Sequence, residues 1–242
     1  MGAIFKKELN HFFNSFVGYI AIVVFLITVG FFVWINSGSN LLDFEFAQLD
    51  LLFQTAPLIL MLIIPAITMR SFAEEYSSGT MEILLTKSIS KTNLLFGKFL
   101  ASLLIAIIAI LPTLIYVFTI FELGMPKGNL DIGSIVSSYI GLIFLSGAFC
   151  SVGIFTSAIS KNQIVAFIMG LFLCYFFYRG FNDISKLPIF YGSLDETIQN
   201  FGLSHHFAAI QKGVLDTRDL VYFTSFISLF LAFCAQTIKD KK

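Results

Sequence analysis

Charged residues are scarce in this sequence. Asp, Glu, Lys and Arg make up 12% of its 242 residues, whereas an ordinary soluble domain has roughly 25%. With 57% hydrophobic residues, a chain of this length has too much apolar surface for one water-soluble core. Acidic and basic residues number 15 each, so there is no basic excess to attract nucleic acid. The composition excludes a soluble globular domain, a disordered chain and a nucleic-acid-binding protein, and it indicates a protein with several membrane spans.

Motifs for nucleotide hydrolysis and metal binding are also absent. A phosphate-binding loop needs Gly-x-x-x-x-Gly-Lys followed by Ser or Thr, but Gly97-Lys98 is followed by Phe99 and has no glycine five residues earlier. His205 and His206 are adjacent, which places them badly for chelating one ion from one helix face. The three cysteines lie in apolar runs, without the spacing of a metal site or a disulfide framework. We therefore expect a chain with no ATPase activity, metal or cofactor of its own.

Six runs of the sequence lack Asp, Glu, Lys and Arg and are long enough to cross a bilayer, which takes about 20 apolar residues. They predict an all-α membrane protein with six transmembrane helices in one domain covering residues 1–242. None of the runs contains His either, whereas ion-coupled transporters usually carry ionisable residues near the midplane. This argues against an autonomous secondary transporter and against an intramembrane enzyme. The runs are 17–35, 51–69, 99–121, 132–160, 162–178 and 220–238.

The distribution of basic residues predicts the orientation of the chain in the membrane. With the N-terminus inside, ten of the fifteen Lys and Arg residues fall in cytoplasmic segments and five fall outside. The first outer loop, residues 36–50, holds three acidic residues and no basic one. The positive-inside rule therefore favours a cytoplasmic location for both termini, and an even number of spans agrees with it.

The N-terminal residues form an amphipathic pattern. Apolar side chains fall within about half of a helical wheel at ~100° per residue, and Lys6 and Lys7 fall on the other half. An apolar face opposite lysines predicts a helix lying in the cytoplasmic interface of the bilayer; a plain leader to the first span is the alternative. The apolar residues are Ile4, Phe5, Leu9, Phe12, Phe13 and Phe16.

The loop between the second and third spans carries helix signals. Ser71, with a glutamate three positions later, has the spacing of a capping box. Gly79 interrupts the pattern, and Thr80 can cap a short helix ending at Leu85. Ser90 can cap the third span. The sequence thus predicts a short cytoplasmic helix held between two membrane helices.

The loop before the sixth span is the largest outer segment. Ser193 begins a second capping-box pattern, and Ser204 can start another short helix. Asp216 can cap the sixth span, with Asp219 in its first turn, where the helix dipole favours a carboxylate. We expect short amphipathic helices at the outer interface.

Small residues recur at four-residue spacing in the fourth span, a pattern that lets helices approach closely. Packing within the chain and a dimer face are the two interpretations. The pairs are Ser137/Gly141, Gly147/Ser151 and Gly153/Ser157.

Segments outside the spans resemble a known family. The pattern R-x-F-x-E-E-x-x-x-G-T-x-E-x-L-L at 70–85, followed by S-I-S at 88–90 and G-K-F at 97–99, resembles the coupling region of ABC-2 type transporter permeases. The segment KKELNHFFNSFVGYI at 6–20 is similar to the interfacial helix of that family. The segment 204–223 is similar to the outer loop of a branch that includes permeases for gliding motility and for multicopper-enzyme maturation.

The resemblance implies a permease subunit of an ATP-driven exporter in the bacterial inner membrane. Such permeases act as dimers, with a second copy or a paralogous permease, together with separate ATPase subunits that bind ATP and Mg. The resemblance also implies which side chains face the ATPase: Glu75, Gly79, Thr80, Glu82 and Leu85.

Three functions stay open at this stage. The first is export in gliding motility, the second is export for multicopper-enzyme maturation or another task, and the third is a membrane scaffold that transports nothing. The 30 phenylalanines suit lipid-facing surfaces as well as a hydrophobic cargo, so they select no substrate.

Overall fold

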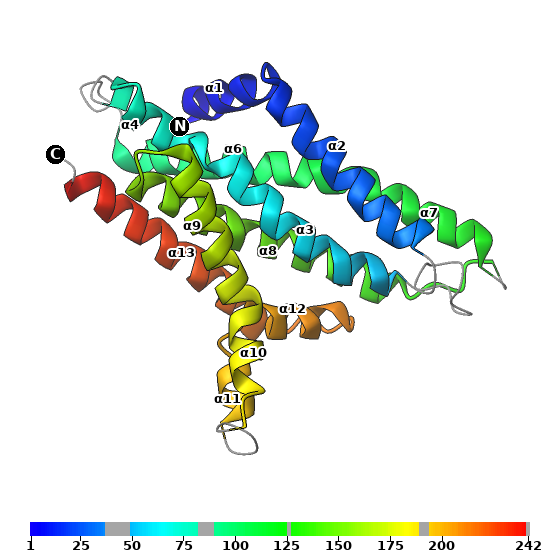
Figure 1. Ribbon diagram of the computed structural model, residues 1–242. Helices are drawn as coiled ribbons and strands as arrows, with labels where there is room; N and C mark the ends of the chain where they lie inside the picture. Colours follow the sequence, from blue (N-terminus) through cyan, green and yellow to red (C-terminus); the bar gives the residue numbers. More distant parts are fainter. Residues whose placement is uncertain (37–48, 82–89, 125–126, 189–193, 241–242) are drawn as a thin grey trace.

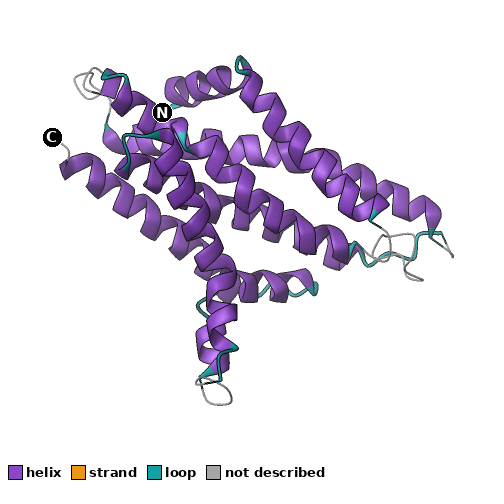
Figure 2. Cartoon of the chain, in the orientation of Figure 1, coloured by secondary structure: helices purple, strands orange, loops and turns teal. Residues whose placement is uncertain are grey.

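The computed structural model describes residues 1–36, 49–81, 90–124, 127–188 and 194–240. Within these ranges the regular secondary structure is helical throughout (Figure 2). Six helical segments are long and apolar enough to cross a membrane, which confirms the prediction of an all-α membrane protein with six spans. The segments are Gly18–Ile35, Asp50–Ser77, Lys91–Leu123, Ile132–Ile159, Gln163–Ser185 and Thr217–Ile238.

Most spans consist of more than one helical piece, and the N-terminal helix and two short helices lie outside them. In chain order the elements are α1 (Gly2–Phe13), α2 (Phe16–Gly30), η1 (Phe31–Ile35), α3 (Asp50–Thr68), α4 (Arg70–Ser77), α6 (Lys91–Ile110), η2 (Leu111–Thr113), α7 (Leu114–Leu123), α8 (Ile132–Ile159), α9 (Gln163–Tyr175), η3 (Phe176–Gly180), α10 (Phe181–Ser185), α11 (Asp195–Gln199), α12 (Leu203–Gln211) and α13 (Thr217–Asp240).

Helix α8 is the core of the bundle. Its apolar stretch is 78% buried inside the protein, against 22% for the first span. Its glycines admit three neighbours, because Gly141 faces α12, Gly147 faces α13 and Gly153 faces α3. A methyl group on Gly153 would overlap the Thr68 hydroxyl, so no larger residue fits there. The small residues of the fourth span therefore serve packing within this chain.

The second span continues almost without a break into α4. The sequence pattern instead predicted that the span ends at residue 69. Only Met69 separates α3 from α4, and its backbone N–H still donates to the Pro65 carbonyl at 2.9 Å. The prediction of a capping box at Ser71 was therefore wrong: the N-cap position is Met69, and no side chain of α4 itself caps the helix. Instead, Ser157 of α8 accepts hydrogen bonds from the N–H groups of Phe72 and Ala73, at 2.9 and 3.0 Å.

Other helix boundaries match the sequence more closely. Ser90 caps α6 by accepting from the Asn93 N–H at 3.2 Å, and Asp216 accepts from the Arg218 N–H at 2.9 Å before α13. The fifth span is longer than expected, since it continues through η3 and α10 to Ser185. Arg179, which was expected to end that span, lies within it.

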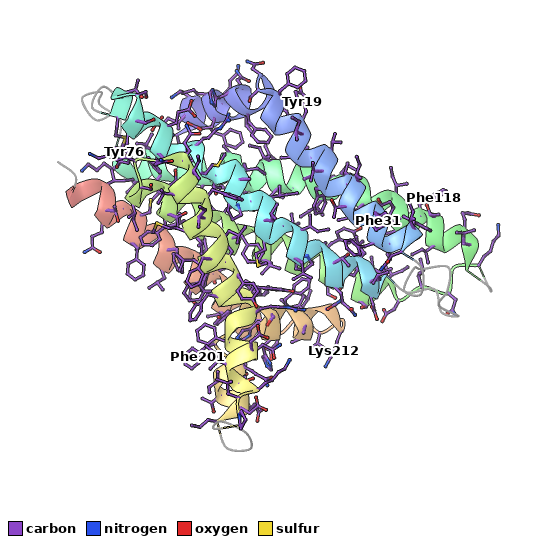
Figure 3. All side chains as sticks on the ribbon, viewed as in Figure 1. Tyr19, Phe31, Tyr76, Phe118, Phe201 and Lys212 are labelled. Atoms are coloured by element: carbon purple, nitrogen blue, oxygen red, sulfur yellow. The ribbon has the colours of Figure 1, made fainter. Side chains whose placement is uncertain are left out.

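The two ends of the bundle differ. Helix α1, the end of α4 and the C-terminal end of α13 lie at one end, whereas α10 and α11 extend from the other side and α12 lies across the bundle (Figure 1). Large apolar side chains point outward from the spans, as Figure 3 shows for Phe31 and Phe118, which are 48% and 67% exposed. An apolar outer surface of this kind suits contact with lipid.

Candidate functional site

The most unusual side chain in the bundle is a buried lysine at the end that carries the termini. Lys98 is 1% exposed, although Lys is almost never fully buried unless it is paired. Its Nζ lies 2.9 Å from Glu8 Oε1 of α1 and 2.9 Å from Glu75 Oε1 of α4. It also donates to the Ser71 carbonyl oxygen and lies 4.9 Å from the centre of the Phe72 ring. One cation thus joins three helices, α1, α4 and α6.

The residue before this lysine explains how α1 reaches the site. A methyl group on Gly97 would lie 3.0 Å from the Cγ2 atom of Ile4, so glycine is what lets the two helices touch. Ile4 is the buried residue of α1 and fills this gap. Because Gly97 and Lys98 are consecutive on α6, one provides close packing to α1 and the other provides charge pairing to α1 and α4.

The charges at this junction balance. Lys7 of α1 lies 3.4 Å from Glu75 Oε1, so two lysines face two glutamates. Paired charges tolerate burial because each replaces part of the hydration that the other loses. His11 and Glu74 form a second contact at 3.8 Å between α1 and α4, nearer the surface. The α1–α4–α6 junction, as we call this cluster of Lys7, Glu8, Glu75 and Lys98, is a polar connection at the base of an apolar bundle.

A cavity of about 200 Å³ opens beside the junction, between α1, α3, α4 and α6. Both Arg70 and Glu74 line it together with the four junction residues. Two buried polar atoms there, Arg70 Nε and Glu75 Oε2, have no hydrogen-bond partner among the described residues. Atoms of this kind in a polar cavity large enough for water are the ones that ordered water satisfies.

The sequence-predicted ATPase-facing residues lie at or beyond the end of α4. Glu75 is buried in the junction. Gly79 has φ +70° with no neighbouring atom near its missing side chain, so it ends α4 in a conformation that favours glycine. Thr80 is exposed, and its hydroxyl lies 2.9 Å from that of Ser78. Both Glu82 and Leu85 lie outside the described residues.

The N-terminal helix forms where the sequence placed it. Lys6 and Lys7 are exposed, whereas Phe5, Leu9 and Phe12 are partly buried. Part of the apolar face packs on α6, through Ile4. Its location in a membrane interface stays a prediction.

Sequence reasoning missed the junction itself. Lys98 was taken as the boundary of the third span, and Glu8 was assigned no role. The available signal was the position of Lys98 in α6, which starts at Lys91: a lysine two turns inside an apolar helix needs a partner. Among the described residues, no group of His, Cys, Asp and Glu could hold a metal ion.

These features define a multi-pass membrane protein whose spans are tied to one polar junction near its termini. The chain belongs to the ABC-2 family of transporter proteins, because the model of that family matches residues 3–237. Membership makes the chain a membrane permease component of an ABC exporter, and it implies partnership with an ABC ATPase subunit. No curated protein matches the chain.

Proposed function

We propose that this chain is the permease subunit that couples ATP hydrolysis by a separate ATPase to substrate movement across the bacterial inner membrane. The observation that carries the proposal is the α1–α4–α6 junction. A force applied at the free end of α4 reaches α6 through Glu75 and Lys98, whose charged atoms are 2.9 Å apart. ATP and Mg bind to the partner ATPase. This chain supplies the surface on which the ATPase docks and the contacts that carry its movement to the spans.

The docking surface that we propose extends from the end of α4 into residues 82–85. Gly79 and Thr80 are exposed at this end, and Glu82 and Leu85 follow in sequence. Glu82 is suited to basic or polar groups on the ATPase, and Leu85 to an apolar notch. Glu75 contributes indirectly, because its burial leaves it holding α4 to Lys98 rather than facing a partner.

Both termini are assigned to the cytoplasm in this proposal. The excess of basic residues on that side supports the orientation, and α1 and the C-terminal end of α13 lie at the same end of the bundle as α4 (Figure 1). We further propose that the permease works as a dimer, with a second copy or a paralogue, and that it serves gliding motility. The role in gliding motility is supported by the resemblance of segment 204–223, and of the six-span arrangement, to the permease branch that includes the gliding-motility permeases.

The test is affinity purification of the tagged full chain from native membranes. Three chains are compared: the parent, a variant with Thr80–Leu85 scrambled, and Glu82→Lys. We expect an ATPase with a phosphate-binding loop to co-purify with the parent, and to be lost or no longer stimulated with both variants, while all three insert equally into the membrane.

A control variant at the other end of the bundle, Lys186→Gln, changes charge without touching α4 and should retain the ATPase. If no ATPase accompanies the parent chain, the permease proposal fails and a membrane scaffold becomes the better account. If the ATPase accompanies all chains equally, the docking surface lies elsewhere.

A further inference from the structure

A second polar hollow lies at the other end of the bundle, far from the junction. It has a volume of about 410 Å³, is open to the outside, and is lined by residues of α3, η3, α10, α11 and α12. Phe201 and Lys212, labelled in Figure 3, lie just before and just after α12 in the chain. This α12 hollow is large enough for a small organic ligand, for which sites of roughly 300–1,000 Å³ are typical.

The walls of the hollow are held in place by hydrogen bonds that do not occupy it. Asp219 Oδ1 of α13 lies 2.6 Å from His206 Nδ1 of α12. Ser134 of α8 donates to the Gln211 carbonyl at 2.7 Å. Since α12 is fixed on both sides, the hollow is a built feature rather than a gap between loose helices.

The side chains that face the hollow are rich in hydrogen-bond donors. Arg179 is charged, and Gln54, Asn182 and Gln211 each carry a carboxamide NH₂ group. The structure shows no side-chain hydrogen bond or ion pair for these four among the described residues. His205 also lines the wall. Four donor groups from three different segments of the chain therefore line one hollow with no side-chain partner among the described residues, and their full or partial exposure leaves them free to bind a ligand in place of water.

The charge of the hollow has one sign. Among the described residues that line it, Arg179 carries a full charge and none is acidic. Two carboxylates close in sequence to the lining accept other hydrogen bonds, since Asp183 accepts from Tyr175 and Asp195 accepts from Gln199. Two more, Asp50 and Asp131, line the neighbouring cavity on the far side of Gln54 and Gln211, together with Lys212. An unpaired guanidinium with neighbouring donors and no carboxylate favours an anion.

We propose that the α12 hollow binds a phosphate-bearing group. The guanidinium of Arg179 matches two phosphate oxygens in a bidentate pair, and the carboxamides can donate to the others. Phe53 and Tyr178 add aromatic surface to the wall, which suits the organic part of a phosphate ester. The group is either a lipid headgroup or part of a soluble molecule; the proposal does not depend on the ATPase partnership.

The test uses the purified full chain and three probes. Phosphatidylglycerol carries the phosphate on a lipid, diacylglycerol with the same acyl chains lacks it, and glycerol 3-phosphate is the soluble counterpart. Lipid binding is measured by native mass spectrometry, and binding of the soluble probe by calorimetry. Each is measured for the parent, Arg179→Gln, Gln54→Leu and the control Lys186→Gln, which removes a charge at an exposed site outside the hollow.

We expect a phosphate-bearing probe to bind the parent at least tenfold more tightly than Arg179→Gln, the loss typical of a charge-assisted hydrogen bond. Gln54→Leu should lose a smaller factor, and Lys186→Gln should bind as the parent does. Binding of phosphatidylglycerol alone assigns a lipid headgroup, and binding of glycerol 3-phosphate assigns a soluble source.

The proposal is overturned if neither phosphate probe binds, if diacylglycerol binds as tightly as phosphatidylglycerol, or if Arg179→Gln and Lys186→Gln lose the same factor. Because Arg179 is exposed, we expect its variant to keep the unfolding temperature of the parent, which separates lost binding from lost folding.

Discussion

Lys98→Met is the sharpest perturbation of the α1–α4–α6 junction. Methionine keeps the unbranched apolar stem of the lysine and removes its charge. The change leaves Glu8 and Glu75, with side chains 18% and 11% exposed, without their shared cation. Breaking a buried ion pair by removing one partner costs about 3–5 kcal/mol. Here Glu8 loses the cation it is paired with, and Glu75 keeps only the exposed Lys7, 3.4 Å away. We expect Lys98→Met to lower the free energy of unfolding by that amount.

The chain offers a matched control for this prediction. Lys127 and Glu122 form an ion pair of similar length, 3.0 Å, but their side chains are 73% and 47% exposed. An exposed pair contributes roughly 0–1 kcal/mol, so Lys127→Met should change stability by less than 1 kcal/mol. Both variants replace a lysine by methionine, so the difference between them reports how deeply the ion pair is buried.

The assay is unfolding of the detergent-solubilised full chain, followed by the fluorescence of Trp34, the single tryptophan. Trp34 packs against Tyr116, with ring centres 5.6 Å apart, away from the junction. The triple variant Glu8→Gln/Glu75→Gln/Lys98→Met should recover most of the loss, since it neutralises the three buried or partly buried members of the junction together and leaves only the exposed Lys7 charged. Equal stability of Lys98→Met and Lys127→Met, or no recovery in the triple variant, would refute the reasoning.

Three further predictions concern packing and backbone. Gly153→Ala should destabilise the fold by about 1–3 kcal/mol through overpacking against Thr68, and Thr68→Ala should restore part of the loss in the same unfolding assay. Ser157→Ala should cost about 1–3 kcal/mol, because two buried N–H groups of α4 lose their acceptor; protection of those amides from hydrogen exchange should fall while that of α13 does not. Gly79→Ala should cost about 1 kcal/mol, from its φ of +70° alone; a cost several-fold larger would show that its side-chain space is occupied.

The six spans could be predicted because each is a local property of the sequence, an uninterrupted apolar run. The caps at Ser90 and Asp216 could be predicted for the same reason, since an N-cap acts on residues two or three positions away. The junction could not be predicted in this way. Lys98 pairs with Glu8 and Glu75, which lie far from it in sequence and come from two other helices.

The wrong capping box has the same origin. Ser71 has the right spacing, but the second span does not stop before it, so the chain needs no local cap there. Ser157 supplies the acceptor from a helix more than eighty residues later. A similar limit applies to the fifth span, which was predicted to end before Arg179. The helix continues past this residue, because its guanidinium group reaches the polar α12 hollow while its apolar stem stays along the span.

The near-continuity of α3 and α4 has a mechanical consequence. Together they form a shaft of 28 residues from Asp50 to Ser77, about 42 Å long at 1.5 Å per residue. Its two prolines, Pro57 and Pro65, are both buried in the bundle, which limits bending at these points. If the shaft pivots rigidly about its α4 end by about 5°, its far end sweeps about 4 Å. Gln54 lies in the second turn from that far end, on the wall of the α12 hollow. A small rotation at the α4 end of the shaft would therefore change the shape of the hollow at the opposite side of the membrane.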